Sequence, residues 1–115
     1  MRSVVYYGEY NSEDISIIRA YLNQIIGTNL SPRFIIEHVI NKSPTMVAYI
    51  DIYLMRVPLV VRSHNVVISN ISMRRLNRLC KKYNIKSRTT MLSCLLKLFS
   101  TVYRSELIVK NNRKK

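Results

Sequence analysis

Residues 79 to 99 read LCKKYNIKSRTTMLSCLLKLF, and the pattern of apolar and basic residues in this stretch decides the expected fold. Its first part ends a helix that we expect to begin near Ser72 and to carry basic residues on its outer face. The apolar residues of that helix recur at helical spacing, at Met73, Leu76, Cys80 and Tyr83. Asn84 tolerates the left-handed conformation in which helices commonly end, so we expect the helix to stop there.

A second helix is expected after this turn. Ile85 would enter the core, and Ser87 or Thr89 has the side-chain oxygen of an N-cap residue. The apolar positions of this last helix are Met91, Leu92, Leu95, Leu98, Phe99 and Val102. Their helical spacing predicts a face that packs against the rest of the domain.

Upstream of this pair, three further helices are expected. Asn11 or Ser12 can cap the first, and Gly27 fits the left-handed position at its end. Ser31 and Ser43 are each followed by proline, which is favoured at the first helical position. These two pairs therefore predict the starts of the second and third helices.

The third of these helices is apolar nearly all round, so we expect it to be the central one and to end before Pro58. Residues 3–7 are expected to be extended, whereas residues 59–68 fit either a short hairpin or an irregular connection. The two glycines and three prolines are few for a many-stranded sandwich or barrel. The sequence therefore predicts an all-α fold, with about five helices in one small domain over residues 1–109.

The net positive charge of the chain lies entirely in its second half. Residues 1–61 contain five basic and five acidic residues, whereas residues 62–115 contain fourteen basic residues and one acidic residue. Self-repulsion of this size destabilises a compact state unless a partner neutralises it. We therefore expect a neutral scaffold over 1–61, a basic part over 62–109 that binds a polyanion, and a basic tail over 110–115.

Residues 72–103 resemble the helix-turn-helix unit of many DNA-binding proteins. In that family the first helix ends near a small residue, which Cys80 matches, and the turn contributes one buried aliphatic residue, which Ile85 matches. The sequence departs from the family at Asn84, where glycine is usual, and by one extra residue after Ile85. These departures affect the expected orientation of the second helix.

The resemblance implies that the second helix enters the major groove with its N-terminus first. Hydroxyl groups and an arginine there would reach phosphates and base edges, and Arg88 could bind guanine. The basic residues of the preceding helix would lie along the phosphate backbone. The expected nucleic-acid-binding residues are Arg74, Arg75, Arg78, Lys81, Lys82, Lys86, Ser87, Arg88, Thr89, Thr90, Ser93 and Lys97.

Two other interpretations of the same stretch stay open. It also resembles the helix-extended-helix module of the SAP type, which implies binding to the DNA backbone in a different geometry. The basic residues could also be an ordinary solvated face of a helical hairpin. Charge alone does not separate RNA from DNA, although the resemblances favour DNA.

A second resemblance, over residues 15–66, is to the cyclin box and the TFIIB-like fold. Residues 43–66 read SPTMVAYIDIYLMRVPLVVRSHNV, with the Ser-Pro start, the Tyr-Ile-Asp helix and the Ser-x-Asn-Val turn of that family. Residues 15–22, ISIIRAYL, resemble its first helix. The resemblance implies a protein-interaction module that binds a kinase or a transcription partner. Ile52 departs from it, since cyclins usually carry arginine there.

The sequence does not predict an enzyme, a cofactor or a metal site. Six carboxylates form no convincing acid–base pair, and no glycine-rich phosphate loop is present. Cys80 and Cys94 form no CxxC pair and share no zinc-site spacing with His38 or His64. No apolar segment is long enough for a membrane span.

We therefore expect an intracellular protein, cytoplasmic or nuclear, with a regulatory or architectural role in transcription. Its expected partner is nucleic acid. Residues 12–57 are the expected surface for a homodimer or a protein partner, and we expect no contact with a membrane.

Overall fold

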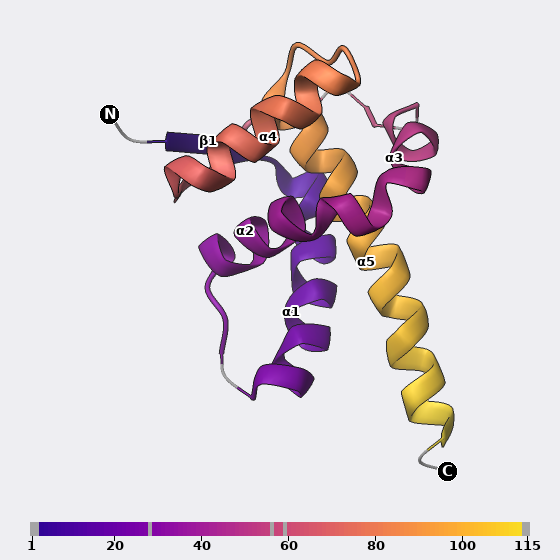
Figure 1. The fold of residues 1–115 in the computed structure, drawn as a ribbon. Helices are drawn as coiled ribbons and strands as arrows, with labels where there is room; N and C mark the ends of the chain where they lie inside the picture. Colours follow the sequence, from indigo (N-terminus) through magenta and orange to yellow (C-terminus); the bar gives the residue numbers. More distant parts are fainter. Residues whose placement is uncertain (1–2, 28, 56, 59, 114–115) are drawn as a thin grey trace.

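The fold of this chain is predominantly helical, as the sequence predicts. The computed structural model describes residues 3–27, 29–55, 57–58 and 60–113, the residues after 107 by their backbone only. Within these residues five α-helices and two short strands form one small domain (Figure 1). The elements are β1 (Ser3–Tyr7), α1 (Ser12–Ile26), α2 (Pro32–Lys42), α3 (Val47–Leu54), β2 (His64–Ile68), α4 (Asn70–Lys82) and α5 (Arg88–Arg113), with 3₁₀ turns at Glu9–Asn11 and Ser43–Met46.

Helix α5 is the central element of the fold. The other four helices and β1 all contact it, and its C-terminal half projects beyond them (Figure 1). Residues 91–96 and 98–100 are buried on every side of this helix. The helix extends to Arg113, so residues 110–113, which the sequence assigned to a tail, are helical.

The prediction that the third helix is central is wrong. Ile50 is the one buried residue in α3, all of which the structure describes, and Tyr49, Ile52 and Met55 beside it are at least half exposed. Although α3 is apolar in composition, it is covered mainly on one side, where it packs against α5.

The predicted end of α1 and the predicted N-cap of α2 are confirmed, whereas Asn11 lies at the N-cap position of α1 without a side-chain capping bond. Gly27 ends α1 with a left-handed φ of 79°, and its N–H donates to the Asn23 carbonyl at 2.7 Å. Ser31 caps α2, because its hydroxyl accepts from the Phe34 N–H at 3.3 Å. Ser43 does not start a helix in this way: it is buried and its hydroxyl donates to the Ile40 carbonyl, so the chain passes from α2 through a 3₁₀ turn into α3.

The two strands pair with each other across the length of the chain. They are antiparallel, with Ser3 opposite Ile68 and Tyr7 opposite His64. Val5, Tyr7 and Ile68 form the buried face of this ribbon. The local hairpin considered for residues 59–68 is therefore wrong, because the β-branched residues of β2 find their partners in β1.

Helix α4 is fixed at both ends by hydrogen bonds. Ser69 caps α4 by accepting from the Ser72 N–H at 3.1 Å. The helix begins at Asn70, two residues before the start that the sequence predicts. Glu37 of α2 accepts from the Ser69 N–H at 2.8 Å and from the Ser72 hydroxyl at 3.1 Å. These bonds hold α4 against α2.

The turn between α4 and α5 closes as a Schellman motif. Asn84 has a left-handed φ of 55°. Its N–H donates to the Lys81 carbonyl at 3.3 Å, and the Ile85 N–H donates to the Cys80 carbonyl at 2.8 Å. Ser87 then caps α5 by accepting from the Thr90 N–H at 3.2 Å. The sequence-based expectations for this turn are confirmed.

Candidate nucleic-acid interface

Helix α4 presents a continuous basic face to solvent. Leu76, Leu79 and Cys80 are buried against the core, which turns the basic residues of the helix outward. The exposed residues of this α4 basic face are Arg74, Arg75, Arg78, Lys81 and Lys82. None of them forms an ion pair with a carboxylate among the residues that the structure describes.

Neutral neighbours orient part of this face. Arg75 donates from Nη1 to the Asn41 side-chain oxygen at 2.7 Å, and the Lys82 ammonium lies 5.6 Å from the centre of the Tyr83 ring. A shallow groove of about 340 Å³ runs between α4 and the 3₁₀ turn after α2, with Arg75, Arg78 and Lys82 on its α4 side. The full charges of these side chains are therefore available to an anionic ligand.

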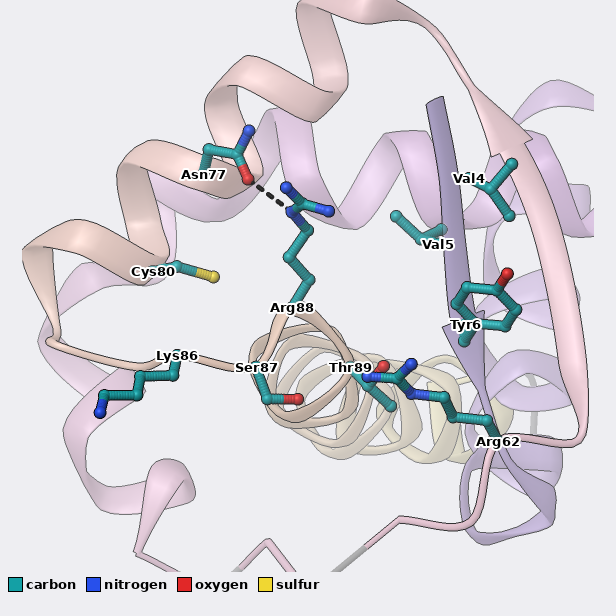
Figure 2. A pocket seen from close by; sticks show the side chains of 10 residues that line it. All are labelled: Val4, Val5, Tyr6, Arg62, Asn77, Cys80, Lys86, Ser87, Arg88 and Thr89. Carbon is teal, nitrogen blue, oxygen red and sulfur yellow. Dashed lines mark hydrogen bonds between the residues drawn. The ribbon is translucent and has the colours of Figure 1, made fainter. Parts of the chain in front are cut away.

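The α4–α5 turn adds two more exposed cations, Lys86 and Arg88. Arg88 is the first residue of α5, and its Nε donates to the Asn77 side-chain oxygen at 2.7 Å (Figure 2). Arg88 therefore lies beside α4, and Asn77 holds its guanidinium in place.

The body of α5 is not an exposed recognition helix. Ser93 is fully buried, Thr89 is 5 % exposed, and Lys97 lies 3.1 Å from the buried Asp14 carboxylate. We therefore withdraw Ser93 and Lys97 as nucleic-acid contacts. The helix-turn-helix resemblance implied an exposed second helix, but the middle of α5 is enclosed by the other helices. Of the predicted contacts on α5, only Arg88 in its first turn is exposed.

A pocket of about 360 Å³ lies at this first turn, between β1 and the α4–α5 turn. Figure 2 looks along α5, with Ser87, Arg88 and Thr89 around its end and Arg62 extending toward Thr89 from the opposite wall. The Arg62 guanidinium lies 5.3 Å from the centre of the Tyr6 ring. Sequence reasoning missed both residues, because only the pairing of β1 with β2 brings them to this turn.

Cys80 of α4 also lines this pocket. Burial raises the pKa of the Cys80 thiol, while the charge of Arg88 acts in the opposite direction. Cys94 is buried deeper, and burial raises the pKa of its thiol to about 12. Both cysteines are free thiols.

Comparisons of the chain with protein-family models, curated proteins and solved structures returned no match. A function therefore has to be inferred from the surface itself. In the part of the chain described, no group of three or more His, Cys, Asp or Glu side chains could hold a metal ion. Among the same residues, no helix is long and apolar enough to cross a membrane.

The two histidines have partners that tie elements of the fold together. His38 of α2 lies 2.7 Å from the Tyr103 hydroxyl of α5, and His64 of β2 lies 2.7 Å from the Glu9 carboxylate. Neither neighbours a serine or cysteine nucleophile in the contacts of the described residues. These pairs explain why the histidines lie where they do without invoking catalysis.

Proposed function

We propose that this protein binds nucleic acid, and DNA in preference to RNA, through the α4 basic face and the first turn of α5. The observation that carries the proposal is that five exposed cations share one helix face and none has a carboxylate partner among the described residues. Unpaired cations at this density attract a polyanion and release its counterions on binding.

The burial of α5 favours contacts to the phosphate backbone over reading of base edges. In a helix-turn-helix complex, several turns of the second helix lie in the major groove. Here the residues between Met91 and Ser100 are buried except for Lys97, which pairs with Asp14, so the predicted contacts that remain accessible lie in the first turn of α5 and just before it. We therefore infer a regulatory or architectural protein that tolerates many sequences, with any base preference supplied by Arg88.

The salt dependence of DNA binding tests this proposal. Fluorescence anisotropy should show that the logarithm of the affinity of the wild-type chain for duplex DNA falls linearly with the logarithm of the salt concentration. Replacing Arg74, Arg78 and Lys81 by glutamine removes three phosphate contacts, so the slope should become shallower by about 2.7, at about 0.9 per contact. Duplex RNA in parallel measures the preference for DNA.

A matched variant controls for net charge. Replacing Arg33, Lys42 and Arg104 by glutamine removes the same charge from exposed positions outside α4, and two of them form surface ion pairs. This variant should keep the wild-type slope within about one unit, the contribution of a single contact. Equal slopes for the two triple variants, or a wild-type affinity that ignores salt, would remove the basis of the proposal.

A second candidate function is a cyclin-like protein-interaction module. The observation that favours it is the outer surface of α3, where Tyr49 and Ile52 are half exposed and Met55 is 88 % exposed. Exposed apolar side chains at helical spacing are typical of docking surfaces. A pull-down from nuclease-treated extract discriminates the two functions: a stoichiometric kinase or transcription partner, captured equally by wild type and the α4 triple variant, would favour this one.

A further inference from the structure

The pocket at the first turn of α5 has the charge of an anion site. Arg62, Lys86 and Arg88 line it, and no acidic residue is present among its described lining residues. Lys86 lies at the rim, whereas the Arg62 side chain extends across the pocket toward α5 (Figure 2). The three cations come from two segments that are distant in the sequence, so the fold concentrates positive charge here.

Thr89 supplies the observation that points to a ligand. This residue is 5 % exposed and lines the pocket, yet its hydroxyl makes no hydrogen bond to any residue that the structure describes. Buried polar side chains nearly always have a hydrogen-bond partner. The Thr89 oxygen is not among the fully enclosed side-chain atoms that lack a partner, so it borders the open, cationic pocket and is a donor with room for an anionic acceptor beside it.

The backbone N–H groups at the start of α5 also favour an anion in this pocket. The first N–H groups of a helix have no acceptor within it, and Ser87 satisfies only that of Thr90. The N–H groups of Arg88 and Thr89 therefore remain for other acceptors. The positive end of the helix dipole favours an anion at the same place.

We propose that this pocket binds one phosphate group of a nucleic-acid strand. The Thr89 hydroxyl and the first amides of α5 hydrogen-bond the phosphate oxygens, and Arg62 and Arg88 neutralise their charge. Asn77 acts as a positioning residue, because it holds Arg88 by its Nε and leaves the outer nitrogens for the ligand. The proposal rests on the proposed function for the source of the phosphate.

The size of the pocket indicates that the phosphate belongs to a nucleotide. A volume of about 360 Å³ lies within the range of ligand pockets, roughly 300–1,000 Å³, and exceeds what a small ion needs. The far wall is formed by Val4, Val5 and Tyr6 of β1. Apolar and aromatic side chains in that position suit the sugar or base attached to the phosphate.

Titration of the ¹⁵N-labelled full chain with inorganic phosphate tests the site directly. We expect saturable shifts of the Arg88 and Thr89 amide signals. Thr89→Val, which keeps the shape and removes the hydroxyl, should weaken binding about tenfold, as loss of one hydrogen bond to a charged group does. Thr89→Ser should restore it, and Thr101→Val, at an exposed threonine later in α5, should leave it unchanged.

Arg62→Gln gives an independent test, because Arg62 is exposed and its replacement should not disturb folding. This variant should also weaken phosphate binding at least several-fold, since it removes one of three cations. Saturable shifts that are unchanged in both Thr89→Val and Arg62→Gln would place the anion elsewhere and overturn the proposal. An absence of saturable shifts at the α5 amides would do the same.

Oligonucleotides identify the source of the phosphate. Single strands with a 5′-phosphate and with a 5′-hydroxyl are compared by the same amide shifts. Tighter binding of the phosphorylated strand supports a terminal phosphate in the pocket, and equal binding that is lost in Thr89→Val supports an internal one. DNA binding that persists without shifts at these amides refutes the subsite alone. Phosphate binding without any DNA binding refutes the proposed function and leaves the anion site.

Discussion

Replacing Lys97 by methionine tests whether this lysine belongs to the core or to the interface. Its ammonium lies 3.1 Å from Oδ2 of Asp14, whose side chain is 4 % exposed. The same carboxylate accepts from the Asn11 amide at 3.0 Å and from the Ser100 hydroxyl at 2.6 Å. Lys97 is therefore the cationic member of a network around the buried Asp14 carboxylate that joins α1 to α5.

The expected loss of stability follows from this geometry. Removing one partner of a buried ion pair costs about 3–5 kcal/mol, because the other charge stays buried and unpaired. The Lys97 side chain is 35 % exposed, and Asp14 keeps two hydrogen bonds after the substitution, so part of that cost is screened. We expect Lys97→Met to lower the free energy of unfolding by about 2 kcal/mol, and the melting temperature by roughly 8 °C.

Urea unfolding followed by circular dichroism measures this loss, and a double-mutant cycle with Asp14→Asn measures the coupling. We expect a coupling energy of about 1–2 kcal/mol. Lys97→Met should also leave DNA affinity and its salt slope unchanged. An unaltered stability together with a slope shallower by about 0.9 would refute this reasoning and return Lys97 to the DNA interface.

Three further outcomes follow from particular side chains. A thiol reagent should modify Cys80 before Cys94, because Cys80 lines the α5 pocket whereas Cys94 is fully buried with a pKa of about 12; mass spectrometry of partly alkylated protein checks this, and equal rates would contradict it. Asn84→Ala should lower the free energy of unfolding by about 1 kcal/mol, since alanine is strained at the φ of 55°, while Asn84→Gly should not; a loss of similar size in both would point to the side chain instead. Burial, and then the charge of Lys42, lowers the pKa of His38, so the unfolded chain binds the proton more tightly and stability should fall as the pH drops below about 6.5. Urea midpoints at pH 7.5 and 5.5 should differ less in His38→Gln than in the wild type, and an equal fall in both would assign the pH dependence to other groups.

The ends of the helices were predictable because they depend on local chemistry. Gly27 and Asn84 adopt the left-handed conformations that their residue types allow, and Ser31 and Ser87 cap the helices that follow them. Each of these features involves residues within one turn of each other. Local sequence therefore contained enough information to place them.

The arrangement of the helices was not predictable in the same way. The residues of α3 look more deeply buried than those of α5, because α5 includes Thr89, Ser93 and Ser100 among its buried positions. Burial of these hydroxyl groups depends on partners far away in the chain, such as the bond from the Ser100 hydroxyl to Asp14. Composition cannot reveal such partners, so the apolar segment was mistaken for the central one.

One part of the candidate site was predictable from local sequence and the other part was not. The α4 basic face follows from the helical spacing of residues 73–83, since positions opposite an apolar stripe face solvent. The pocket at α5 requires Arg62 and Tyr6, which only the pairing of β1 with β2 brings to the α4–α5 turn. Pairing between strands about sixty residues apart leaves no local signal.

The central position of α5 has a consequence for how the chain acquires its structure during synthesis. The ribosome makes α1 and α2 well before α5, yet Ile18, Ile35 and Ile40 reach full burial in a core whose middle is α5. At about 5–20 residues per second, the nascent chain exposes these side chains for several seconds. The apolar side chains of the first half therefore stay open to aggregation until α5 is available to cover them.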